Sequence, residues 1–171
     1  MKTLVRGVAA LCILGLATVA SAETITLDLT KVTVDVPEGW TQKDVGNNTR
    51  SLDDPNKQVN IAIIGTEGQN LLTVVTNVTA MLKKMMPKLK LDKGKKAAIN
   101  GMTGKVFAGS GVYGPKPVKV GLVVLETPDH HGLMVVTIAE AAKAKANAKA
   151  VAGILASLKP PAAAPAPAPA P

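Results

Sequence analysis

Ala98–Ala139 reads AINGMTGKVFAGSGVYGPKPVKVGLVVLETPDHHGLMVVTIA, in which runs of strand-forming residues alternate with turn signals. Asn100-Gly101 is the dipeptide that a two-residue type I′ hairpin favours, so it should join the strands on either side of it. Including the run just before this stretch, the predicted strands cover about Lys88–Ile99, Met102–Val112, Val118–Glu126 and Leu133–Ala139. Consecutive strands with short connections predict an antiparallel meander.

Two segments around the meander have the periodicity of amphipathic helices. The first is predicted over about Gln69–Met86 and ends at Pro87, which cannot continue a helix. Its apolar stripe consists of Leu71, Val74, Val75, Val78, Met81, Leu82 and Met85. The second is predicted over about Ala141–Leu158, with an apolar face of Ala144, Ala148, Val151, Leu155 and Leu158. We expect both helices to pack on the sheet.

The N-terminal part of the sequence predicts further strands. Apolar residues alternate over Ile25–Leu29 and Val32–Val36, with a bulge or tight turn at Thr30-Lys31 between them. Asp53–Asn56 is a turn signal that predicts a hairpin ending in the strand Gln58–Ile64. The order of strands, helix, meander and helix predicts an α+β fold in which helices flank an antiparallel β-sheet.

Five segments together resemble the Mog/PsbP-like superfamily, including its DcrB-like exported bacterial members. They are VPEGW (Val36–Trp40), DDPNKQVNIAI (Asp53–Ile63), the first long helix, NGMTGKVF (Asn100–Phe107) and AVAGILASLK (Ala150–Lys159). The resemblance implies an α-β-α sandwich. It also implies a non-catalytic interaction or assembly protein, and therefore a binding module rather than an enzyme.

The two ends of the chain differ in composition from the segment between them. Residues 1–22 contain Lys2 and Arg6, an apolar run and Ala20-Ser21-Ala22, which is the pattern of a secretory signal peptide. Residues 160–171 form a Pro/Ala tail that favours an extended or disordered chain. We therefore predict a signal peptide, a single domain over residues 23–159 and a spacer, in a periplasmic or secreted protein.

Charge is the main functional signal. Removing Lys2 and Arg6 from the 20 basic residues leaves 18 against 12 acidic residues, a net charge of +6. Seven lysines with a single acid, Asp92, fall between residues 83 and 96, and they are Lys83, Lys84, Lys88, Lys90, Lys93, Lys95 and Lys96. This cluster predicts either a solvated surface or a contact with an anionic partner, such as a membrane surface or an acidic protein. Nucleic acid is disfavoured, because Arg50 is the one arginine left after residue 22.

Two motifs could carry chemistry. Asp129, His130 and His131, with Glu126 nearby, are weak candidates for a metal or acid–base site in a turn. Gly109–Gly114 matches the spacing of a dinucleotide-binding loop, but Pro115 and Pro117 lead into a strand where that loop needs a helix. We therefore predict neither a cofactor nor a catalytic residue.

The sequence leaves three hypotheses open. The first is a non-catalytic exported module that acts through protein–protein contacts in the cell envelope, with the seven lysines as its contact surface. The second is a binder of anionic lipid or of a small anionic ligand through the same lysines. The third is a metal-assisted hydrolase at Asp129, His130 and His131.

Overall fold

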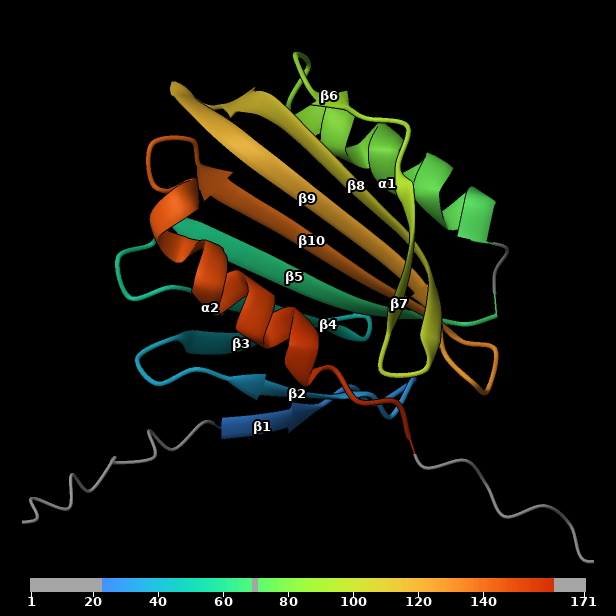
Figure 1. Ribbon diagram of the computed structural model, residues 1–171. Coiled ribbons are helices and arrows are strands. Elements are labelled where there is room, and N and C mark those ends of the chain that lie inside the picture. The colour runs from blue at the N-terminus through green and yellow to red at the C-terminus, as the bar shows by residue number, and fades with distance from the viewer. Residues whose placement is uncertain (1–22, 69–70, 162–171) are drawn as a thin grey trace, which may run out of the picture.

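Antiparallel pairing joins eight strands into one sheet in the computed structural model, which describes residues 23–68 and 71–161 (Figure 1). The strand order is β3-β4-β5-β10-β9-β8-β6, and β7 also pairs with β8, so β6 and β7 share one edge. The strands are β3 (Thr41–Gly46), β4 (Thr49–Asp53), β5 (Val59–Thr66), β6 (Lys90–Leu91), β7 (Lys95–Ile99), β8 (Met102–Tyr113), β9 (Lys116–Glu126) and β10 (Gly132–Glu140). The predicted α+β class and antiparallel meander are confirmed.

Each face of the sheet is covered by a different layer (Figure 1). Helix α1 (Leu71–Met85) packs on one face, and α2 (Ala144–Ser157) packs on the other with the hairpin of β1 (Glu23–Thr26) and β2 (Thr33–Val36). Successive side chains of a strand point to opposite faces. Leu122 therefore joins the core under α1, while Val123 joins the core under α2. The predicted α-β-α sandwich is confirmed.

The buried faces of the helices differ from the predicted stripes. On α1 the buried line runs through Val74, Val78 and Leu82 to Met86, whereas Met81 and Met85 are each 45% exposed. Their assignment to the core was wrong. The buried line contains every fourth residue from Val74 to Met86, and Met81 and Met85 each precede a member of that line by one position, so they lie on the neighbouring part of the helix surface. On α2 the residue buried within the helix is Ile154, and the predicted Ala148 is exposed.

The β7–β8 hairpin forms as the sequence predicts. Asn100 and Gly101 both have positive φ, 47° and 86°, as a type I′ turn requires. The single strand predicted before it, over Lys88–Ile99, was wrong, because Gly94 adopts a φ of 71° and divides the segment into β6 and β7. The carboxylate of Asp92 stabilises this break by accepting hydrogen bonds from the amides of Gly94 (2.9 Å) and Ala108 (3.2 Å).

Strand β3 was not predicted from the sequence. All six of its residues are exposed, so it has no apolar alternation that would reveal a strand. The turn after it contains Asn47 and Asn48 with φ of 49° and 55°, and this pair is the signal that could have indicated a hairpin.

The remaining predictions concern the ends of the domain. The tight turn before β2 is confirmed by a hydrogen bond of 2.9 Å from the amide of Lys31 to the carbonyl oxygen of Leu27. The signal peptide (1–22) and most of the Pro/Ala tail (160–171) lie outside the described residues, so this division of the chain stays a prediction. Within residues 23–68 and 71–161, neither helix has the length and apolar character needed to cross a bilayer.

Candidate functional site

The seven lysines predicted as a contact surface lie on α1, β6 and β7 and on the segments that connect them, near the β6–β7 edge of the sheet. Lys83 and Lys84 are in the last turn of α1, Lys90 is on β6, and Lys95 and Lys96 are on β7. Lys88 and Lys93 lie in the connecting segments. All seven are exposed, and we call this set the lysine face. No ion pair among the described residues involves any of them.

The side chains of the lysine face point to two sides of the sheet. Lys95 lies opposite Val106, which packs against the core on the α2 side, so Lys95 points to that side. Lys96 points to the α1 side. Lys83 and Lys90 line a hollow of about 510 Å³ beside Phe107. On the α1 side, Lys83, Lys93 and Lys96 of the lysine face therefore line concave surfaces.

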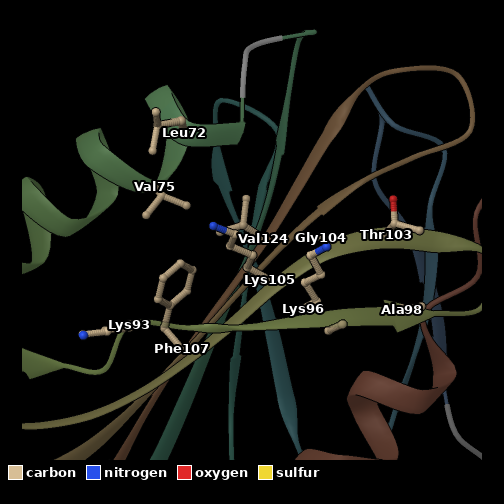
Figure 2. Close-up of a pocket in the computed structure, with 11 residues that line it drawn as sticks. Leu72, Val75, Lys93, Lys96, Ala98, Thr103, Gly104, Lys105, Phe107 and Val124 are labelled. Atoms are coloured by element: carbon tan, nitrogen blue, oxygen red, sulfur yellow. The ribbon is translucent and has the colours of Figure 1, made fainter.

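A larger groove, of about 870 Å³, lies between the N-terminal half of α1 and strands β7, β8 and β9. Figure 2 shows Leu72 and Val75 of α1 on one side of it and Lys105, Phe107 and Val124 of the sheet on the other. Ala97, Ala98 and Gly104 also line it, and the methyl side chain of Ala98, which points to the same side as Lys96, leaves the space open. The groove is thus lined mainly by apolar side chains.

Phe107 forms a fixed part of the groove wall. The ring is 8% exposed and packs on Gly94, where an added Cβ would lie 2.4 Å from the ring. The glycine that breaks the edge strand therefore also makes room for the aromatic ring. Phe107 lines both the groove and the adjoining hollow, so it separates the two.

Three lysines surround the apolar part of the groove. Lys93 and Lys96 belong to the lysine face, and Lys105 of β8 is directly opposite Lys96 in the hairpin register. Lys105 was not among the residues predicted from the sequence. The Asn100-Gly101 turn could have located it, because a two-residue turn that pairs Ile99 with Met102 also pairs Lys96 with Lys105. Within residues 23–68 and 71–161, no acidic side chain lines the groove.

Comparison with known proteins adds information at the level of the fold. No model of a protein family matches the sequence, and no curated protein matches it. Solved structures do match. The cyanobacterial PsbP protein of Synechocystis sp. PCC 6803 superposes with a TM-score of 0.61 at 11% identity, over 85% of this chain and 96% of that one. The chain has the Mog/PsbP-like fold.

Two other structures support the same conclusion. LpqN of Mycobacterium tuberculosis, a protein involved in cell envelope biogenesis, matches with a TM-score of 0.56 at 13% identity, over 81% of this chain and 90% of LpqN. The Ran-binding protein Mog1p of Saccharomyces cerevisiae matches with a TM-score of 0.53 at 10% identity, over 81% and 95% of the two chains. These identities are low, so the similarity establishes the Mog/PsbP-like fold alone.

The histidine turn does not bring its candidate ligands to one point. Nδ1 of His130 lies 2.7 Å from a carboxylate oxygen of Glu126, whereas Nε2 of His131 lies 3.7 Å from Asp129. Each imidazole thus has its own carboxylate partner. Among residues 23–68 and 71–161, no group of three or more His, Cys, Asp and Glu side chains is placed to hold a metal ion.

The glycine pattern Gly109–Gly114 lies at the end of β8 and in the turn to β9. Its first two glycines are inside the strand, where Ser110 pairs with Lys90 of β6. No helix N-terminus follows that could hold a pyrophosphate, as the sequence indicated. In this Mog/PsbP-like fold, the groove and the lysine face are therefore the features best suited to bind a partner.

Proposed function

We propose that this Mog/PsbP-like protein is an exported, non-catalytic binding or assembly module that contacts an acidic protein partner in the cell envelope through the lysine face. One observation carries the proposal: seven exposed lysines occupy consecutive elements at one edge of the sheet, and none has an ion-pair partner among the described residues. The single acid of the stretch, Asp92, is engaged by backbone amides instead. Unpaired charge of one sign favours a partner of the opposite sign.

Export and partner binding each have separate support. The predicted signal peptide at residues 1–22 supports an envelope location, as does the structural similarity to LpqN, which is involved in cell envelope biogenesis. The similarity to Mog1p, a Ran-binding protein, supports a role in protein contacts on this fold. The Pro/Ala tail would give the domain reach toward its partner.

Affinity capture with chemical crosslinking from native envelope extract tests the proposal. The test variant changes the seven lysines of the lysine face to Gln. The control variant changes seven exposed lysines elsewhere to Gln, namely Lys43, Lys57, Lys119, Lys143, Lys145, Lys149 and Lys159. The two variants have equal net charge, so any difference in the protein they capture is due to the position of the substituted lysines.

We expect one stoichiometric protein to be captured by the wild type and the control variant and lost with the test variant. Its capture should also weaken as salt rises, because exposed charges are screened. Equal capture by both variants would assign the lysines to solubility alone. Recovery of lipid without protein would favour the second hypothesis, in which the protein binds an anionic ligand. The groove is the specific observation that supports this second hypothesis.

The metal-assisted hydrolase receives no support from the geometry, since His130 and His131 are paired with different carboxylates. Zinc retained through dialysis, together with a hydrolytic activity that His130→Ala/His131→Ala abolishes, would restore it.

A further inference from the structure

We propose that the groove between α1 and β7–β8 binds a long-chain fatty acid, with the acyl chain along its apolar lining and the carboxylate held by Lys96 and Lys105. The inference goes beyond the protein contact proposed above, because it uses the interior of the groove as well as the surface lysines. It joins two independent features of the same cavity, which are its apolar lining and the sign of its charge.

The apolar lining suits an alkyl chain. Val124 on β9 is 1% exposed and Phe107 on β8 is 8% exposed, so the sheet side is a fixed surface of the core. Leu72 of α1 is 70% exposed on the opposite side. The volume of about 870 Å³ falls in the range of small-molecule sites, about 300 to 1,000 Å³. An alkyl chain would remove this apolar surface from water.

The charge at the groove favours an anion. Lys96 and Lys105 are directly opposite each other on adjacent antiparallel strands, and like charges in that position destabilise a sheet. Lys93 adds a third positive charge. The nearest acid along β9, Glu126, lies opposite Thr103 and is hydrogen bonded to His130. A carboxylate between Lys96 and Lys105 would relieve their repulsion.

The combination of features favours a fatty acid over other anions. A nucleotide or sugar would gain from aromatic surfaces to stack on, and Phe107 is the one aromatic side chain that the described part of the chain contributes to the lining. A purely polar anion would leave the apolar lining unused. A fatty acid has one compact anionic group on one flexible chain, which matches a lysine pair next to an apolar groove.

Isothermal titration calorimetry of the purified mature protein with decanoate, dodecanoate and tetradecanoate, each below its micelle concentration, tests the proposal. We expect one molecule to bind per chain. Affinity should rise about three- to fourfold with each added methylene until the groove is filled. The alcohol of equal length should bind at least about tenfold more weakly, because it lacks the charge-assisted hydrogen bonds.

Three variants locate the site. Lys96→Gln/Lys105→Gln should weaken dodecanoate binding at least about tenfold. Ala98→Trp should abolish it by filling the groove with a side chain that strands accept. Lys143→Gln/Lys145→Gln, with the same charge change on and beside α2, should bind as the wild type does. Unfolding curves verify that each variant folds.

The outcomes separate this inference from the proposed protein contact. Ala98→Trp keeps all seven lysines of the lysine face, so it should lose the fatty acid and still capture the protein partner. Affinity that does not depend on chain length, binding that Ala98→Trp leaves intact, or no binding of any of the three acids would each overturn the inference. Binding confined to anionic vesicles would also overturn it and assign the lysines to a membrane surface.

Discussion

The side-chain amide of Asn100 donates a hydrogen bond of 2.7 Å to the carbonyl oxygen of Leu158, and its second bond, of 2.8 Å, goes to Ala156. Asn100 lies in the turn between β7 and β8, whereas the two acceptors are at the C-terminal end of α2. The last carbonyl groups of a helix have no partner within it. One side chain therefore caps α2 and fixes the hairpin that places Lys96 opposite Lys105.

Asn100→Gly should keep the turn, because Gly accepts positive φ, but lose both side-chain hydrogen bonds. We expect the free energy of unfolding to fall by about 1 to 2 kcal/mol. Asn100→Asp should be less stable still, because a carboxylate cannot donate and is repelled by the negative end of α2. Urea unfolding measures both changes. An Asn100→Gly protein as stable as the wild type would show that the contact does not hold the hairpin.

Asp54 should be essential to the β4–β5 turn. Its side chain is 3% exposed and accepts hydrogen bonds from the backbone amides of Asn56 (3.1 Å), Gln58 (2.5 Å) and Val59 (2.5 Å). Asp54→Ala leaves these donors without an acceptor, so we expect a loss of about 2 to 3 kcal/mol by denaturant unfolding. Asp54→Asn retains one acceptor oxygen and should lose less. Equal losses for the two variants would contradict this account.

Gly104 should tolerate no side chain. An added Cβ would lie 1.9 Å from the carbonyl oxygen of Val124 on the adjacent strand, so β8 and β9 would have to separate. We expect Gly104→Ala to cost at least about 2 kcal/mol. Gly153→Ala on α2 is the control, since its added Cβ would meet nothing within 4 Å. This substitution should stabilise the helix by about 0.5 to 1 kcal/mol. Thermal unfolding of the two variants should shift in opposite directions.

Adjacent methionines at the end of α1 should differ in their effect on stability. Met86 is fully buried, so Met86→Ala should cost about 2 to 5 kcal/mol through the cavity it leaves. Met85 is 45% exposed, and Met85→Ala should stay within about 0.5 kcal/mol of the wild type. Chemical denaturation of both variants checks the assignment. Similar losses would mean that the buried face of α1 is misplaced.

The sequence predicts the helices and strands in which the periodicity of apolar residues marks the buried face. The meander and both helices have apolar periodicity, and Asn100-Gly101 specifies its own turn. Strand β3 has no buried residue, so pairing with β4 holds it and periodicity does not reveal it. At the break, Gly94 packs against the ring of Phe107 on β8, a tertiary contact that apolar periodicity does not reveal.

Some parts of the candidate site can likewise be predicted from the sequence, and others cannot. The lysines are visible as a cluster in the sequence, and the register of the hairpin locates Lys105. The groove itself requires knowledge of which α1 residues approach the sheet. The answer depends on how α1 is rotated about its own axis. This rotation places Met81 and Met85 outside the core, whereas the sequence predicted them inside it.

The strands at the two edges of the sheet are protected in different ways from pairing with another chain. At β7, Lys95 and Lys96 place charge beside the free backbone groups. At β3, the register shifts between Asp44 and Gly46, where the carboxylate of Asp44 accepts a hydrogen bond from the amide of Gly46. Such a bulge bends the strand, so a second copy finds no straight template there. Substituting the lysines of β7 therefore removes protection from one border only, and aggregation of such variants should begin at that border.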